Sequence, residues 1–157
     1  MNLSDRLGLC SKNKKGDAEA EKNIIRFLRG GEDSGWLFDV TMAYYFHSGG
    51  GPMDYAARPS PNIWQLRDGT TLKSNQFGNY MAGYDAGYSC NALLLYTGVR
   101  IGGMIYGANG SSEGWTDSGS VPDINSGFAE GVVDKAIDDA LSDPTATLIL
   151  NVLDKIL

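Results

Sequence analysis

The segment from Gln76 to Cys90 most constrains how this chain can fold, because two residue types recur in it at the spacing of an α-helix. The recurring residues are Tyr80, Tyr84 and Tyr88, with Gly83 and Gly87 beside them. Glycine costs about 1 kcal/mol relative to alanine inside a helix, so two glycines in one helix require a compensating contact. Close approach of another helix backbone is the contact that we expect.

The next segment repeats the glycine spacing. In residues 91–107 two further glycine pairs stand four residues apart, Gly98 with Gly102 and Gly103 with Gly107. We therefore predict that residues 77–107 form two helices whose glycines let them pack closely against each other. Similar spacing drives helix association in membranes, but Asp85 and Arg100 interrupt the apolar run, which is shorter than the ~18 residues of a membrane span. No membrane span is therefore predicted.

The length and composition of the chain are those of a single globular domain. It has 157 residues, of which 42% are hydrophobic and 20% are charged, and its 21 glycines follow no fixed repeat. Cys10 and Cys90 are too few for a disulfide framework, and whether they are free thiols or form one bridge stays open.

The charge is acidic overall and unevenly distributed. The net charge is −6, yet residues 1–30 hold seven basic and four acidic residues, so the remainder of the chain carries −9. An acidic field repels nucleic acid, so a local basic patch or neutral donors would have to hold a polyanionic substrate. Residues 1–15 lack an apolar core, and we therefore expect no secretory leader.

Local patterns predict a mainly α fold, a single compact domain of five or six helices with a small β-hairpin near residues 63–73. Residues 1–16 are polar and are expected to form a flexible arm, followed by one globular domain over residues 17–157. Asp68-Gly69 supplies the hairpin turn. Besides the pair within 77–107, the predicted helices are 17–29 capped by Asp17, 36–46 capped by Asp33 or Ser34, one from Asp123 to about Leu141, and one from Asp143-Pro144 to the chain end.

The helix over residues 36–46 is rich in large apolar side chains and is predicted to bury a broad face. That face consists of Trp36, Leu37, Val40, Tyr44, Tyr45 and Phe46. The helix ends at the glycine-rich loop 48–52, and a second loop is predicted over residues 108–122.

Three short motifs follow one another along the chain: Gly50-Gly51-Pro52-Met53-Asp54-Tyr55, then Phe77-Gly78-Asn79-Tyr80 with Tyr84 and Gly87, then Asp123-Ile124-Asn125-Ser126-Gly127-Phe128. In this order they resemble the bacterial polymorphic toxin type 44 domain, over about residues 44–131. The family usually has Trp where this chain has Met53, and Lys where it has Ala56. These two differences from the family pattern affect the expected substrate contacts more than the expected fold.

The resemblance implies a toxin domain of bacterial conflict systems, delivered out of the producing cell by a secretion apparatus or fused to a carrier. It implies a ribonuclease that acts in the cytoplasm of the target cell, with a cognate immunity protein as partner. The expected lack of a leader agrees with such delivery, whereas the acidic net charge does not favour an RNA substrate.

Asp54, Asn79 and His47 are the first candidates for catalysis. The carboxylate of Asp54, on the glycine-rich loop, would act as a general base or merely cap a turn. The amide of Asn79 would hold an oxyanion or phosphate, or cap a helix or tie down the loop. His47 ends a helix, and the helix C-terminus favours its protonated form, which would act as an acid opposite Asp54. The alternative is that His47 caps the helix at the surface. It is the only histidine, so a two-histidine ribonuclease mechanism is excluded.

Tyrosines are the candidates for substrate contact. Tyr84 would stack on the substrate or donate its hydroxyl, and Tyr55, Tyr80 and Tyr88 would line the same groove. The alternative is that an aromatic stripe at helical spacing belongs to the core.

Asp123 is the last catalytic candidate, either as a second acid facing Asp54 or as the N-cap of its helix. Two carboxylates with separated pKa values would suit glycan hydrolysis, with Glu113 as the acid that meets the substrate, so a peptidoglycan hydrolase acting in the periplasm is the alternative enzyme. A non-catalytic binding or immunity protein is a third possibility. No close spacing of carboxylates supports a metal site, and no cofactor is predicted.

Overall fold

The computed structural model describes residues 15–29, 35–58, 60–110 and 118–145, and confirms the mainly α fold. In this part of the chain the helices are α1 (Ala18–Arg29), α2 (Trp36–His47), α3 (Ser74–Tyr88), α4 (Ala92–Gly110) and α5 (Val121–Ser142), with a 3₁₀ turn at Tyr55–Ala57. The strands are β1 (Gly16–Asp17), β2 (Ile63–Gln65) and β3 (Thr71–Lys73). None of the described helices has the length and hydropathy needed to cross a membrane.

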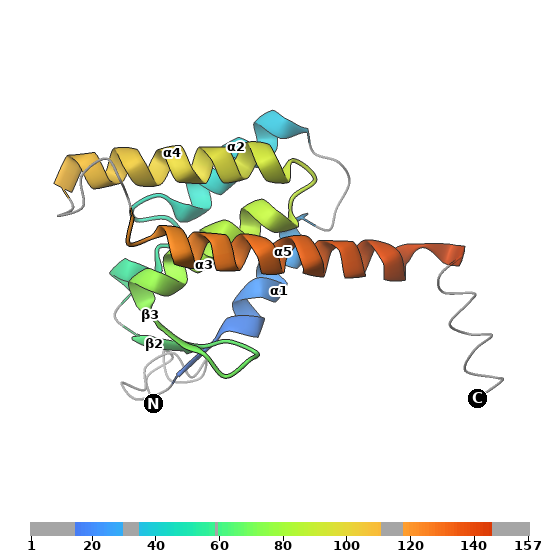
Figure 1. Ribbon diagram of the computed structural model, residues 1–157, viewed down its shortest axis with the longest axis horizontal. Helices are drawn as coiled ribbons and strands as arrows, with labels where there is room; N and C mark the ends of the chain where they lie inside the picture. The colour runs from blue at the N-terminus through green and yellow to red at the C-terminus, as the bar shows by residue number, and fades with distance from the viewer. Residues whose placement is uncertain (1–14, 30–34, 59, 111–117, 146–157) are drawn as a thin grey trace, which may run out of the picture.

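Helix α3 is the central element (Figure 1). Helix α5 runs across it and extends beyond the rest of the fold, α2 and α4 lie on one side, and α1 and the sheet lie on the other. Nine residues of α3 are buried, including Phe77, Met81 and all three of its tyrosines. Every other helix of the described part is therefore placed by its contact with α3 or with a neighbour of α3.

The two helices within 77–107 do pack against each other, as predicted, since Ala86 of α3 and Leu95 of α4 share a buried cluster. The glycines do not make this contact, because Gly83 and Gly87 of α3 pack against α5. A Cβ atom built on Gly83 would lie 2.1 Å from the carbonyl oxygen of Ile124, and one on Gly127 would lie 1.9 Å from that of Tyr80. Gly87 and Gly131 meet the facing backbone in the same way. Glycines four residues apart on both helices thus bring the two backbones into direct contact.

The sheet contains the predicted hairpin. Strands β2 and β3 are antiparallel, with Trp64 opposite Leu72, and Gly69 has the positive φ of +90° that the tight turn requires. Strand β1 adds to β2 in parallel, so Gly16 belongs to the sheet and not to the predicted flexible arm. The ring of Trp64 stacks on Phe77 at 4.2 Å, which ties the sheet to α3.

Helix α2 is oriented differently from the prediction. Its buried residues are Asp39 and Ala43. Of the predicted apolar face, Val40 and Phe46 are half-buried, whereas Trp36, Leu37, Tyr44 and Tyr45 are exposed. The predicted caps Asp33 and Ser34 lie outside the described residues. An ion pair to Asp39, described below, sets this orientation.

The remaining helix ends agree in part with the predictions. Asp17 caps α1, as predicted, by accepting a hydrogen bond from Glu19 N at 3.0 Å. Helix α5 begins at Val121, so Asp123 lies in its first turn and is not its cap. Helix α4 extends to Gly110, into the predicted loop, and the predicted helix after Asp143-Pro144 falls mostly outside the described residues.

Candidate functional site

Each tyrosine of α3 donates its hydroxyl to a carboxylate of α5. Tyr80 bonds Glu130, Tyr84 bonds Asp134 at 2.8 Å, and Tyr88 bonds Asp138 at 2.6 Å. The pattern repeats because both helices carry these residues four positions apart, which places them on one face. We call these three pairs the tyrosine–carboxylate ladder.

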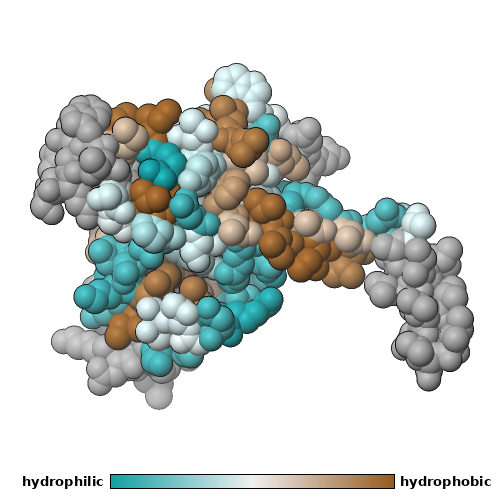
Figure 2. Space-filling model, viewed as in Figure 1, coloured by the Kyte–Doolittle hydropathy of each residue, from teal (hydrophilic) through white to brown (hydrophobic). Residues whose placement is uncertain are grey.

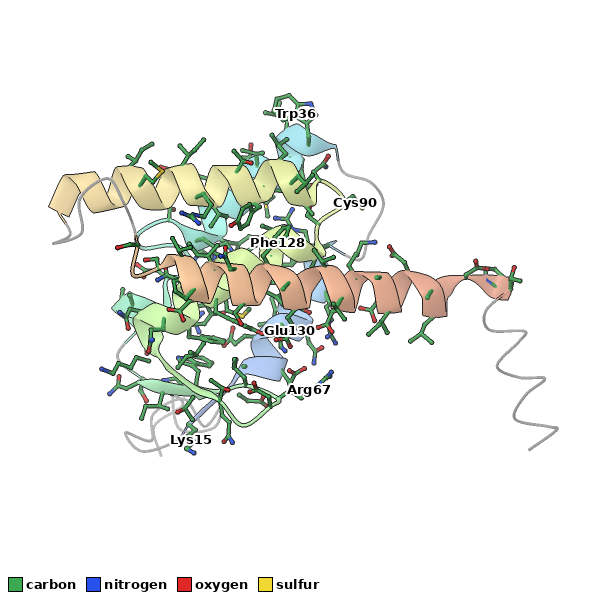
Figure 3. All side chains as sticks on the ribbon, in the orientation of Figure 1. Lys15, Trp36, Arg67, Cys90, Phe128 and Glu130 are labelled. Atoms are coloured by element: carbon green, nitrogen blue, oxygen red, sulfur yellow. The ribbon has the colours of Figure 1, made fainter. Side chains whose placement is uncertain are left out.

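Helix α1 supplies the cations of the ladder. Lys22, which is fully buried, pairs with Glu130 at 2.5 Å. Arg26 pairs with Asp134, and its Nε donates to the hydroxyl of Tyr84 at 2.8 Å. Figure 3 shows Glu130 on the side of α5 that faces α1. The charged face of α1 therefore points inward, and three helices are held together by charge-assisted hydrogen bonds.

The ladder buries the tyrosines that were expected to line a groove. Tyr80 and Tyr84 have no exposed surface, and Tyr88 is nearly as buried. Tyr55 is also buried, where it donates to Glu21 at 2.8 Å. Burial, supported by the neighbouring carboxylate, raises the pKa of each of these hydroxyls above its ordinary value. These side chains are therefore core groups, the alternative that the sequence analysis allowed.

A second buried polar network lies where α1, α2 and α3 meet, and its centre is Asp85. The guanidinium of Arg29 donates from Nε to Asp85 Oδ1 at 2.7 Å and from Nη2 to Oδ2 at 3.1 Å. His47 Nε2 lies 3.1 Å from Asp85 Oδ2. Arg29 Nη1 also donates to Asp39 Oδ1 at 2.8 Å. We call these four residues the Asp85 cluster.

The far side of the Asp85 cluster is closed by the link between α3 and α4. Asp39 Oδ2 accepts from Ser89 Oγ at 3.1 Å and from Asn91 Nδ2 at 2.8 Å. Both carboxylates of the cluster are thus supplied with donors. This arrangement explains why α2 turns Asp39 inward, since an unpaired buried guanidinium would be costly.

Asp85 remains ionised in this setting. Burial alone would raise its pKa, but hydrogen bonds from His47 and Arg29, together with their charges, lower it below its ordinary value. An ionised carboxylate only accepts hydrogen bonds, so the imidazole must donate from Nε2. Nδ1 of His47 has no hydrogen-bond partner among the described residues.

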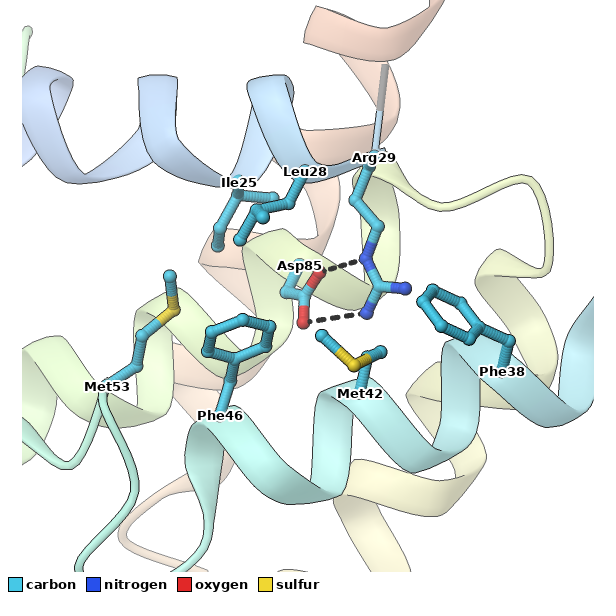
Figure 4. A pocket seen from close by; sticks show the side chains of 8 residues that line it. All are labelled: Ile25, Leu28, Arg29, Phe38, Met42, Phe46, Met53 and Asp85. Carbon is cyan, nitrogen blue, oxygen red and sulfur yellow. Dashed lines mark hydrogen bonds and ion pairs between the residues drawn. The ribbon is translucent and has the colours of Figure 1, made fainter. Parts of the chain in front are cut away.

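A cavity of about 70 Å³ adjoins the Asp85 cluster (Figure 4). The Arg29–Asp85 ion pair forms its polar wall, and apolar side chains form the rest: Ile25, Leu28, Phe38, Met42, Phe46 and Met53. A space of this size exceeds the ~10–15 Å³ that one water molecule needs. The cavity can therefore hold water or a small group next to the ion pair.

Asp54 holds the glycine-rich loop in place. Its Oδ2 accepts from Gly50 N at 2.8 Å, and its Oδ1 accepts from Ala57 N at 3.3 Å, which caps the 3₁₀ turn. This is the turn-capping arrangement weighed from the sequence. Met53, the preceding residue, is buried and reaches the cavity. The loop that carries Asp54 therefore adjoins the Asp85 cluster.

The other predicted site residues are not gathered at one place. Asn79 is half-buried in the second turn of α3, and no hydrogen bond joins it to Asp54 in the described part of the chain. Asp123 is half-buried in α5, where burial raises its pKa. Glu113 lies outside the described residues. Of the catalytic candidates, His47 is the one that the structure places in a polar cluster near the Asp54 loop.

Sequence reasoning missed Arg29, Asp39 and Asp85 as members of a site. Asp85 was noted because it interrupts an apolar run, and as one of several carboxylates whose wide spacing supports no metal site. A carboxylate between Tyr84 and Ala86 in a helix of small and aromatic residues is itself a signal, because a buried charge needs a partner. What no local pattern could supply is the identity of that partner.

Comparisons with protein-family models, with curated proteins and with solved structures find no match to this chain. The resemblance to the type 44 toxin domain therefore stays a prediction that rests on the three motifs.

Proposed function

We propose that the chain is an antibacterial toxin or effector domain that hydrolyses RNA, with His47 as the group that moves the proton. The observation that supports this proposal best is the hydrogen bond between His47 Nε2 and the buried, ionised Asp85. A buried carboxylate that orients an imidazole through one nitrogen leaves the other nitrogen to act as a base.

The chemistry needs one base at the 2′-hydroxyl of the RNA. His47 Nδ1 would take the proton of that hydroxyl, its oxygen would attack the adjacent phosphorus, and the bond from phosphorus to the 5′-oxygen would break. The 5′-oxygen would recover its proton from the same imidazole or from water. The two glycan-cleaving carboxylates of the alternative enzyme are not needed in this scheme.

Access to His47 sets a condition on this proposal. Its Nδ1 is shielded from solvent, so a substrate reaches it only if neighbouring residues move. His47 lies one residue before Gly49, Gly50 and Gly51 of the glycine-rich loop, and Asp54 anchors that loop through Gly50 N. We therefore assign Asp54 to anchoring the loop, while His47 takes the role of base that was predicted for Asp54.

The test uses paired variants in bacteria and with purified protein. His47→Gln retains an amide that can donate to Asp85 but removes the base, and we expect RNA cleavage to fall by about 10²-fold or more. Asp139→Asn, at an exposed position of α5, is the matched control and should retain full cleavage. Thermal unfolding of both variants shows whether either effect comes from misfolding. Undiminished cleavage by a folded His47→Gln protein would remove His47 from the mechanism.

Expression in two compartments separates the substrates. Growth arrest only with cytoplasmic protein supports RNA, and lysis only with exported protein supports the peptidoglycan alternative. Loss of toxicity in Asp54→Asn would support a functional role for the loop. If bacterial growth is unaffected by the protein in either compartment, the result would instead favour a binding protein. The exposed apolar side chains of α2 and α4 support this second candidate.

A further inference from the structure

We infer that the tyrosine–carboxylate ladder conducts one-electron oxidation, so that a radical formed on Tyr80 moves through Tyr84 to Tyr88. Each tyrosine with its carboxylate is one rung of this ladder. The oxidant is of the oxygen-centred radical class, which takes single electrons from phenols. The inference does not depend on the proposed hydrolysis of RNA.

The tyrosine rings of α3 form a continuous stack. The ring centroids of Tyr80 and Tyr84 are 6.5 Å apart with their planes inclined by 20°, and those of Tyr84 and Tyr88 are 6.0 Å apart at 16°. A spacing of four residues within one helix produces this near-parallel arrangement. Electrons tunnel readily between π-systems at such short separations, so each ring can pass an electron to the next.

Each ring of the stack also has a proton acceptor in place. Each of the three hydroxyls donates a hydrogen bond to its own carboxylate on α5. Burial, supported by the neighbouring carboxylate, raises the pKa of these hydroxyls, so the phenols are neutral at physiological pH. A neutral phenol loses an electron most readily when its proton leaves in the same step. The carboxylates are placed to receive that proton.

The stack has a definite inner end. The ring of Phe77 lies 6.0 Å from that of Tyr80, but it has no O–H group and cannot become a neutral radical by losing a proton. Trp64 stacks on Phe77, and its Nε1 has no hydrogen-bond partner among the described residues, so its proton has no acceptor there. The path of proton-coupled oxidation therefore ends at Tyr80.

The cations of α1 favour the radical at the outer rung. The carboxylate partners of Tyr80 and Tyr84 each contact a cation of α1 directly, whereas Arg26 Nε lies 4.0 Å from Asp138. Removing an electron adds one positive charge to a rung, and a cation in direct contact opposes this more strongly. The Asp138 side chain is also the most exposed of the three carboxylates, at 40%. The radical is therefore most stable on Tyr88, at the rung that meets solvent.

The first transfer begins at Glu130, whose side chain is 31% exposed on the side of α5 where Figure 2 shows hydrophilic residues. The oxidant takes one electron from the ring of Tyr80, the O–H bond breaks, and the proton passes to Glu130. The radical of Tyr80 next takes an electron from Tyr84, whose proton passes to Asp134. Glu130 then returns its proton to Tyr80, which is again a neutral phenol.

The second transfer brings the radical to the surface. Tyr88 gives an electron to the radical of Tyr84 and its proton to Asp138. Asp134 returns its proton to Tyr84. A thiolate from solution then gives one electron to Tyr88 and becomes a thiyl radical, while Asp138 returns the proton. The core thus passes an oxidation to solvent without a lasting change in any side chain.

The experiment starts the reaction at the inner rung. A rhenium polypyridyl photo-oxidant, whose excited state takes an electron directly, is attached through Ala129→Cys, an exposed position of α5 next to Glu130. Cys10→Ser and Cys90→Ser remove the native thiols. Transient absorbance and electron paramagnetic resonance follow the tyrosyl radical after a laser flash. The reduced complex returns the electron more slowly the farther the radical has moved, so the unaltered ladder should give a long-lived radical on Tyr88.

Two phenylalanine variants interrupt the path without removing a ring. Tyr84→Phe keeps the stack but holds the radical at Tyr80, so the radical lifetime should fall by about tenfold or more. Tyr88→Phe should also shorten the lifetime, since Tyr84 is then the last ring available. Tyr96→Phe is the matched control, because Tyr96 lies on α4, outside the stack, and donates its hydroxyl to Asn125. This control should leave the lifetime unchanged.

A solvent isotope measurement tests the proton step in the unaltered ladder, and so does not depend on the folding of a tyrosine variant. Because the proton moves with the electron, formation of the radical should be slower in D₂O by about 1.5-fold or more. Near-ultraviolet circular dichroism checks that each variant is folded. An unchanged lifetime in folded Tyr84→Phe, or no isotope effect, would overturn the inference. So would an equal loss in Tyr96→Phe, or a labelled chain that yields no tyrosyl radical.

Discussion

At the scale of single residues, Asp85 shows how a buried charge organises its surroundings. One carboxylate receives donors from α1 and α2, and Arg29 extends the network to Asp39. Such a cluster adds little net stability compared with an apolar core, yet losing one member leaves the others unpaired. His47 is held in one orientation by this network, which is what a proton-transferring imidazole requires.

Replacing Asp85 by Ala should lower the free energy of unfolding by about 3–5 kcal/mol, because the Arg29 guanidinium is then buried without its main partner. Urea denaturation measures the change. The exposed variant Asp139→Asn should stay within about 0.5 kcal/mol of the wild type. A loss below about 1 kcal/mol for Asp85→Ala would mean that Asp39 alone can satisfy Arg29.

At the scale of elements, the fold depends on which glycine pair meets which backbone. Gly83 and Gly87 of α3 interlock with Gly127 and Gly131 of α5, whereas the pair on α4 faces open space. Spacing alone cannot distinguish these cases, since all three helices present glycines four residues apart. The ladder selects α5, because among the helices that the structure describes it is the one that places carboxylates opposite the tyrosines of α3.

Alanine at two glycine positions should therefore act in opposite directions. Gly87→Ala would place a methyl group 2.2 Å from the carbonyl oxygen of Phe128 and should destabilise the fold by about 1–3 kcal/mol or more. Gly98→Ala meets no atom within 4 Å and should stabilise the fold by up to about 1 kcal/mol. Chemical denaturation compares the two. If both variants changed the free energy of unfolding equally, α3 and α5 would have to separate enough to admit a side chain.

At the scale of the whole molecule, stability depends on two groups of ionisable side chains with opposite pKa shifts. Asp85 and Asp134 have lowered pKa values, because their hydrogen bonds and cationic neighbours outweigh the opposing effect of burial. Their stabilisation is present above the unfolded pKa near 3.8 and is lost as pH falls through the folded values. The tyrosines have raised pKa values, so their contribution is present below pH 10 and is lost above it.

The pH profile should accordingly have a plateau between about pH 5 and about pH 9, with unfolding on both sides. The alkaline side is measured by a titration followed by tyrosinate absorbance. The buried tyrosines should ionise together with the loss of near-ultraviolet circular dichroism. Smooth ionisation of Tyr80, Tyr84 and Tyr88 near pH 10, in a chain that stays folded, would contradict the ladder.

The sequence by itself determined the features that depend on neighbours along the chain: helical content, the hairpin at Asp68-Gly69, the cap at Asp17 and the need for a close helix contact at Gly83 and Gly87. These follow from backbone preferences over a few residues, which act wherever the segment lies.

Tertiary structure alone decided which helix fills that contact, which face of α1 and α2 turns inward, and that His47 meets Asp85. These contacts join residues that are 50 positions or more apart in the chain, such as Tyr84 with Asp134 and Arg26 with Tyr84. A buried cation and its carboxylate stabilise each other only when folding brings them together and removes water. Local sequence patterns do not report this long-range stabilisation, so the buried polar networks could be identified only from the tertiary structure.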